Sequence, residues 1–214
     1  MENRSIPSRR NFVKLSALGI IGTLPLITGA HSFFETKYKD NSDLDISIFS
    51  KHLQFLDYKT TGEMAAEMGF SGVDLTVRPQ GHVLPEFVKT DLPIAIEAIK
   101  EAGSNCKMIS TAIESVLNPL DVDIITTAAT LDIQYYRTNW FKYKKELSMN
   151  ESLDFYQKEI YKLGELNQKL GIVGCYQNHD GLDVGSSFWE TDVILKTVNP
   201  IFFGSQFDIR HSMV

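Results

Sequence analysis

The chain has 214 residues, of which 43% are hydrophobic and 22% charged, with a formal net charge of -6. The excess of acidic residues would repel a phosphate backbone, so we expect no nucleic acid among its partners. The roughly 184 residues that follow an N-terminal leader suffice for one domain with a sizeable core.

The first 30 residues are typical of an export signal of the twin-arginine type. A pair of arginines with Phe12 and Lys14 precedes a mildly apolar run over residues 15–30, which a proline interrupts. A membrane-spanning helix needs about 20 apolar residues, so a cleavable signal is favoured over a membrane anchor. We expect a signal over residues 1–30, a linker over residues 31–44, a periplasmic location and no membrane contact after cleavage.

The remainder of the chain alternates between two patterns of hydrophobic residues. Strands are predicted at residues 45–49, 72–77, 106–110, 133–137, 172–176 and 201–207, and helices at 61–68, 91–100, 121–131, 151–170 and 186–198. Asp91 is predicted to cap the second helix, with Pro93 near its start. Regular alternation of this kind predicts a parallel sheet with crossover helices.

The two cysteines, Cys106 and Cys175, both lie in apolar stretches predicted to be strands. The interiors of parallel strands seldom bring two thiols into bonding geometry, so buried free thiols are favoured over a disulfide.

Two closures of the sheet fit the alternation: an open doubly wound sheet, and an eight-stranded barrel, which needs about 250 residues. No Gly-rich phosphate loop follows the first predicted strand, whereas polar residues follow strand after strand, as on the catalytic face of a barrel. These residues are His52, Asp74, Arg78, His82, Glu114, Arg137, Gln177, His179, Asp208, Arg210 and His211. We predict a (β/α)8 barrel domain over residues 45–214 with only about six βα units present. Two unpaired sheet edges would favour self-association as a homo-oligomer.

Five segments of the chain resemble the sugar phosphate isomerase/epimerase family, whose fold is the xylose isomerase-like TIM barrel. They are residues 49–56, 69–79, 81–85, 176–179 and 207–211, and they include Gly-Phe-Ser-Gly-Val-Asp-Leu from Gly69 and Asp-Ile-Arg-His from Asp208. The resemblance covers residues 46–214, and exported bacterial members of the family often carry the same leader.

The resemblance implies a divalent metal cation (Mn, Zn, Mg or Co) held by residues after the last four strands. Asp208 matches the aspartate after the sixth strand, whereas Gln177 stands where the family has a glutamate after the fifth. The ligands after the seventh and eighth strands have no counterpart in these 214 residues, which suggests a chain truncated at its C-terminus. Asp208 and His211, three residues apart where a strand gives way to a loop, can share one cation, and His179 could replace the missing glutamate.

Sugar isomerisation and epimerisation need a base next to a carbonyl, a Lewis acid for the enediolate and polar groups that orient hydroxyls. We expect Asp208, His179 and His211 to bind the metal, and His211, His179 and Glu114 to serve in catalysis. The expected substrate-binding residues are His52, Arg78, His82, Arg137, Gln177 and Arg210. Arg78 has an alternative role as a structural ion pair with Asp74.

These features predict a metal-dependent sugar isomerase or epimerase that acts on a small sugar or sugar derivative through an enediolate. One alternative is a non-catalytic or truncated carbohydrate-binding relative, which Gln177 favours. An endonuclease of the same fold shares the Asp-x-x-His spacing. Without residues 1–30 the net charge is -9, which argues against a nuclease.

Overall fold

The computed structural model describes residues 44–213; the predicted signal, and the predicted linker up to residue 43, lie outside this range. All six predicted strands and all five predicted helices are present, with boundaries that shift by a few residues. The strands are β1 (Ser47–Phe49), β2 (Gly72–Val77), β3 (Asn105–Thr111), β4 (Tyr135–Arg137), β5 (Val173–Gln177) and β6 (Phe203–Gln206). The helices are α2 (Tyr58–Glu67), α3 (Val88–Glu101), α4 (Pro119–Thr130), α5 (Met149–Leu170) and α6 (Phe188–Leu195), with 3-10 turns η2 (Ser50–Leu53) and η3 (Pro85–Phe87).

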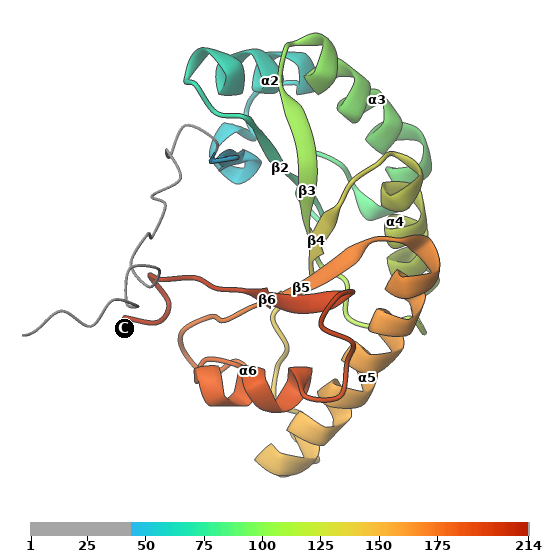
Figure 1. Cartoon of the computed structure of the whole chain (residues 1–214), viewed down its shortest axis with the longest axis vertical. Coiled ribbons are helices and arrows are strands. Elements are labelled where there is room, and N and C mark those ends of the chain that lie inside the picture. The colour runs from blue at the N-terminus through green and yellow to red at the C-terminus, as the bar shows by residue number, and fades with distance from the viewer. Residues whose placement is uncertain (1–43, 214) are drawn as a thin grey trace, which may run out of the picture. The chain divides into compact units, whose positions relative to one another are not determined.

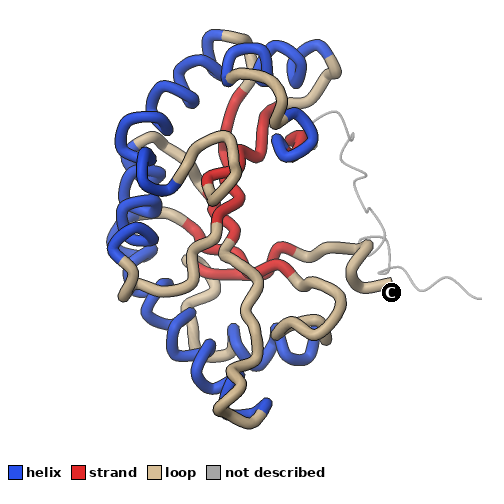
Figure 2. Tube along the Cα trace, turned by 180° about the vertical axis from the view of Figure 1, so that it is seen from behind, coloured by secondary structure: helices blue, strands red, loops and turns tan. Residues whose placement is uncertain are grey.

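The strands form one sheet in the order β1-β2-β3-β4-β5-β6, and every neighbouring pair is parallel. A doubly wound sheet reverses its strand order at a switch point, whereas this order never reverses. Figures 1 and 2 show helices α2 to α5 in an arc along the outside of the strands. The described residues therefore have the winding of a (β/α)8 barrel, which confirms the barrel over the open sheet.

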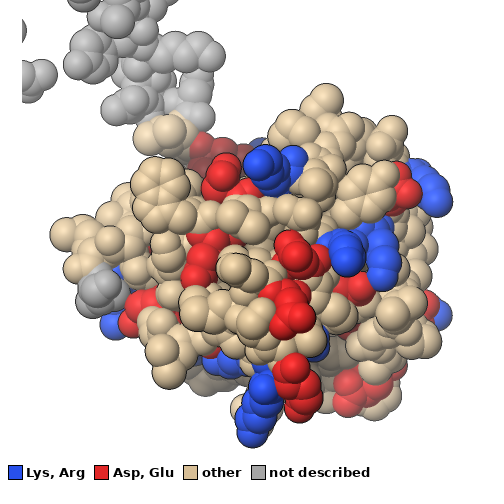
Figure 3. Space-filling view, turned by 90° about the horizontal axis from the view of Figure 1, so that it is seen from below, with Lys and Arg blue, Asp and Glu red and all other residues tan. Residues whose placement is uncertain are grey.

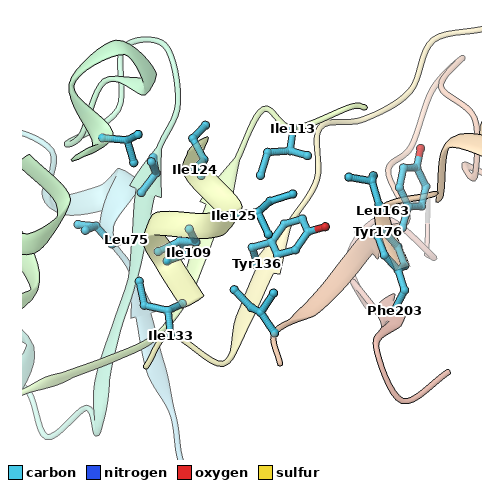
Figure 4. Close-up of a cluster of buried hydrophobic side chains, with 14 of the residues drawn as sticks. Leu75, Ile109, Ile113, Ile124, Ile125, Ile133, Tyr136, Leu163, Tyr176 and Phe203 are labelled. Carbon is cyan, nitrogen blue, oxygen red and sulfur yellow. The ribbon is translucent and has the colours of Figure 1, made fainter. Parts of the chain in front are cut away.

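The alternation of side chains along each strand separates an apolar face from a polar one. Leu75, Ile109 and Tyr136 are fully buried in the cluster that joins the sheet to the helices. Figure 4 shows Ile124 and Ile125 of α4 beside this row. The neighbouring positions in the strands therefore point to the opposite face, where polar residues gather.

The longest helix, α5, has defined signals at both ends. Ser148 and Glu151 form a capping box at its N-terminus, and Gly171 ends it with φ 73°, a left-handed conformation that glycine adopts without strain. Within residues 44–213, no helix is both long and apolar enough to cross a membrane.

The predicted start of α3 is wrong. The helix begins at Val88, directly after η3, so Asp91 lies in its first turn and Pro93 lies inside it. The turn that begins the helix is set by Pro85, because a proline is preorganised for the first position of a helical turn. Asp91 and Pro93 therefore predicted the presence of the helix correctly but placed its first residue too late in the chain.

Both cysteines are free thiols, as predicted, with Cys106 buried and Cys175 partly buried. Figure 3 views the molecule from below, and on that face acidic and basic side chains lie interspersed rather than gathered into patches of one sign.

The core can be tested by a pair of isoleucine truncations. Ile109→Ala should lower the free energy of unfolding by about 2–5 kcal/mol, because the side chain is fully buried in β3 and its loss leaves a cavity. Ile94→Ala, at a position that is 60% exposed on α3, should change it by less than about 0.5 kcal/mol. Urea unfolding of both variants measures the difference, and equal losses would contradict the assignment of faces.

Candidate active site

A cavity of about 630 Å³ lies at the carboxyl ends of the strands. The last residues of four strands, Phe49, Arg137, Gln177 and Gln206, are part of its wall. The other lining residues are Ser47, Lys51, His52, Asp74, Ser110, Trp140, His179, Asp208, Arg210 and His211. The tips of strands far apart in the sequence thus converge on one polar cavity.

The side chain of Gln177 joins the ends of β4, β5 and β6. Its Oε1 accepts hydrogen bonds from Nη1 of Arg137 and Nε1 of Trp140, both at 3.2 Å. Because both of these groups can only donate, they fix the orientation of the amide, and its Nε2 donates to Oδ2 of Asp208 at 2.7 Å. The position where a metal-binding glutamate was expected therefore presents an N–H to Asp208.

Asn178 holds the loop that carries the residues after β6. It is buried, its Oδ1 accepts from the backbone N–H of Asp208 at 2.7 Å, and its Nδ2 donates to the carbonyl of Asp208 and to the Ser212 hydroxyl. Oδ1 of Asp208 accepts from the backbone N–H of His211 at 3.2 Å. The Asp-x-x-His segment is thus a turn whose position is set from β5.

Three side chains on the loops after β5 and β6 form a cluster of atoms able to bind a metal. One nitrogen or oxygen from each of His179, Asp180 and His211 lies within 4.8 Å of the other two. The two imidazole rings have centroids 4.1 Å apart. Nδ1 of His211 is buried and lies 2.5 Å from Oδ1 of Asp180.

This donor set fits a divalent cation, because two imidazole nitrogens and a carboxylate are ligands that Zn²⁺ and Mn²⁺ accept. Asp208 lies at the edge of the cluster, with its Oδ2 3.8 Å from Nε2 of His211. The pair formed by Gln177 and Asp208 fits a cation poorly, because an amide N–H already occupies the Asp208 oxygen. Of the predicted ligands, His179 and His211 lie side by side, and Asp180 joins them although the sequence reasoning did not include it.

Asp74, which lines the cavity, is a second residue whose role the sequence reasoning missed. Its Oδ2 accepts from the Ser110 hydroxyl at 3.0 Å, whereas its Oδ1 is shielded from solvent and has no hydrogen-bond partner within residues 44–213. Burial raises the pKa of Asp74 to about 6, although the Ser110 hydrogen bond and the charges of Arg137 and Arg78 lower it. The sequence did carry a signal for this residue, because Asp74 is the only charged residue in the predicted strand Gly-Val-Asp-Leu-Thr-Val.

The remaining predicted residues of the cavity are His52, Arg137 and Arg210. Burial lowers the pKa of Arg137 to about 10, and its guanidinium lies 4.6 Å from the ring centre of Trp140. Arg137 is buried whereas His52 and Arg210 are exposed, so it is the arginine that the cavity wall holds in a fixed place.

Three predicted site residues do not line the cavity. His82 lies between Thr61 and Thr76, with its ring nitrogens 3.4 and 3.2 Å from their hydroxyls, and burial lowers its pKa. The Arg78 guanidinium lies 5.7 Å from the ring centre of Phe49, and no ion pair joins it to Asp74 among the described residues. The carboxylate of Glu114 accepts from the side chain of Asn139 at 2.6 Å.

The buried charge of Asp74 predicts a pH-dependent stability. Its folded pKa of about 6 exceeds the unfolded value of 3.8, so this residue stabilises the fold below pH 3.8 and loses that contribution as the pH rises through 6. Between pH 4 and pH 7.5, wild type should lose about 2 kcal/mol of unfolding free energy relative to Asp74→Asn. Urea unfolding across this pH range measures the loss. Asp154→Asn, an exposed control on α5, should follow wild type, and a pH-independent gap would contradict the burial of Asp74.

No known family model matches the sequence. No curated protein matches it either. Solved structures do match: D-psicose 3-epimerase in the presence of D-fructose aligns with TM-score 0.61 and 14% identity, over 79% of this chain and 65% of that one. The 3-keto-D-glucoside 4-epimerase of E. coli aligns with TM-score 0.63 and 12% identity, over 80% and 70%.

A xylose isomerase-like TIM barrel protein from Mycobacterium smegmatis, in complex with magnesium, aligns with TM-score 0.56 and 11% identity, over 76% of this chain and 64% of that one. The chain thus spans about two thirds of the length of the structures that it matches. The structure and these likenesses together show that the chain has the fold of the xylose isomerase-like barrels, the fold of sugar epimerases and isomerases.

Proposed function

We propose that the cavity binds a small sugar or sugar derivative and supports its isomerisation or epimerisation through an enediolate, with a divalent cation bound. The observation that carries the proposal is the convergence of Arg137, Asp208, His179 and His211 on one cavity at the strand ends of this fold. Sugar epimerases with the same fold are among the structures that the chain matches.

The cavity offers the groups that a polyhydroxylated ligand needs. Gln206 Oε1 and Asp74 Oδ1 are buried acceptors without partners among the described residues, and sugar hydroxyls could donate to both. Trp140 and Phe49 add aromatic surface to the wall. The guanidinium of Arg137 supplies a fixed positive charge for a carbonyl or enediolate oxygen.

His179, Asp180 and His211 are the residues that would hold the cation. A divalent cation there would act as a Lewis acid on substrate oxygens. Asp208 contributes mainly by position: its carboxylate holds the turn that presents His211 and is itself held by Gln177.

The metal proposal can be tested by removing one imidazole. His211→Ala should weaken Mn²⁺ binding by about 10- to 100-fold, because it removes one of three protein ligands. Equilibrium dialysis with metal analysis measures the affinity. His52→Ala removes a histidine of the same cavity that lies outside the cluster, and it should leave the affinity within about twofold. Equal effects of both substitutions would contradict the assignment.

A second candidate function is sugar binding without catalysis, and the amide of Gln177 favours it. A glutamine cannot act as a base, and here its N–H ties up an oxygen of Asp208 in place of a cation. Under this reading the cavity would bind a sugar and leave its carbon–hydrogen bonds intact.

Gln177→Glu tests whether residue 177 can be a cation ligand or only a hydrogen-bond partner of Asp208. The change places a second carboxylate against Asp208, so without metal the free energy of unfolding should fall by about 1–3 kcal/mol. Mn²⁺ should restore it, because two carboxylates facing each other form a cation site. Thermal unfolding with and without Mn²⁺ measures both effects, and Gln177→Leu, which cannot bind a cation, is the control. An equal response of both variants to Mn²⁺ would argue against a ligand position at residue 177.

We also propose that the chain is exported by the twin-arginine route and acts in the periplasm. The proposal rests on the paired arginines and apolar run of residues 1–30. We further propose that the chain self-associates as a homo-oligomer, because its sheet, within residues 44–213, has two unpaired edges.

A further inference from the structure

The cavity needs a proton-transfer group if it is to carry out enediolate chemistry, and the amide at residue 177 cannot supply one. Two carboxylates, Asp74 and Asp208, line the cavity within the described residues. Both oxygens of Asp208 already accept hydrogen bonds, from Gln177 and from the backbone of His211. Oδ2 of Asp74 accepts from the Ser110 hydroxyl, and its Oδ1 is buried without a hydrogen-bond partner among the described residues.

The carboxylate of Asp74 is held in a defined orientation by a short chain of hydrogen bonds. Nε of Arg137 donates to the Ser110 hydroxyl oxygen at 3.3 Å. The Ser110 hydroxyl therefore directs its own hydrogen to Oδ2 of Asp74, at 3.0 Å. Ser110 and Arg137 are direct partners in the register of β3 and β4, so the sheet itself sets this spacing.

We propose that Asp74 of β2 is the catalytic base of the cavity. The sequence had instead predicted His211, His179 and Glu114 for catalysis. The inference rests on the proposed function. The ionised carboxylate takes the proton from the carbon next to the sugar carbonyl, so a C–H bond breaks and an O–H bond forms. The C–H electron pair becomes the C=C bond, and the carbonyl π pair moves to oxygen to give the enediolate.

The Asp74 carboxyl, whose proton can exchange with solvent, then returns a proton to the former carbonyl carbon. The hydroxyl proton on the first carbon passes to the enediolate oxygen, so the carbonyl moves to the first carbon and the carboxylate is regenerated. The positive charge of Arg137, which borders the same cavity, stabilises the enediolate oxygen. One carboxyl that gives and takes a single proton suffices for transfer between adjacent carbons.

The surroundings of Asp74 suit a group that must exist in both protonation states. Burial is the main cause of its raised pKa, about 6, against the lowering effect of Ser110, Arg137 and Arg78. The other titratable groups that face it are the thiols of Cys106 on β3 and Cys175 on β5, whose pKa values burial and the Asp74 charge both raise, so both stay neutral. A base with a pKa close to the working pH transfers protons in both directions effectively.

The test is deuterium exchange into D-fructose in ²H₂O, followed by proton NMR, with Mn²⁺ present. Asp74→Asn should lower the exchange rate by roughly 100-fold or more. Its affinity for D-fructose, measured by calorimetry, should stay within about threefold of wild type, because the amide keeps the shape and the Ser110 contact. Asp154→Asn removes an exposed carboxylate of α5 and should exchange at the wild-type rate.

A second measurement uses wild type alone. The exchange rate should fall as the pH drops through about 6, because only the ionised carboxylate accepts a proton. Exchange by Asp74→Asn within about threefold of wild type would overturn the role of Asp74 and leave the proposed function intact. Binding of D-fructose without exchange in wild type would overturn it in favour of the non-catalytic reading. Failure of wild type to bind or exchange either D-fructose or D-allulose would overturn both proposals.

Discussion

The amide of Gln177 is the contact on which the arrangement of the site depends. Two groups that can only donate, on Arg137 and Trp140, fix its oxygen, so its N–H must face Asp208. This single orientation joins the ends of β4, β5 and β6 through hydrogen bonds. The side chain at the end of β5 is therefore an amide that donates to Asp208 rather than a carboxylate.

The sheet determines which side chains face the cavity and which face the helices. Neighbouring residues of a strand point to opposite faces, so Leu75 beside Asp74 and Ile109 beside Ser110 pack against the helices while their partners face the cavity. The apolar face supplies stability. The polar face holds charges at a cost in free energy, as the raised pKa of Asp74 and the lowered pKa of Arg137 indicate.

Such costs concentrate where function requires them. A buried carboxylate with an unpartnered oxygen destabilises the empty protein, and a ligand that donates a hydrogen bond to it recovers part of that free energy. The same holds for Gln206 Oε1, which also lacks a hydrogen-bond partner among the described residues. Asp74, Gln206 and His211, which come from β2, β6 and the loop after β6, all line one cavity.

The sequence by itself determined the order and type of the elements and the polar residues at the strand ends, because periodicity and glycine stops act over a few neighbouring residues. It placed the start of α3 wrongly, since Pro85 and Asp91 both carry start signals and only the packing of η3 separates them. The tertiary structure alone decided that His82 is held between Thr61 and Thr76, outside the cavity wall, and that Asp74 bonds to Ser110 rather than to Arg78, the alternative considered for that arginine. The reason is physical: the pKa and orientation of a side chain depend on partners that are distant along the chain, such as Gln177 for Asp208 and Ser110 for Asp74, and only the folded sheet brings those partners together.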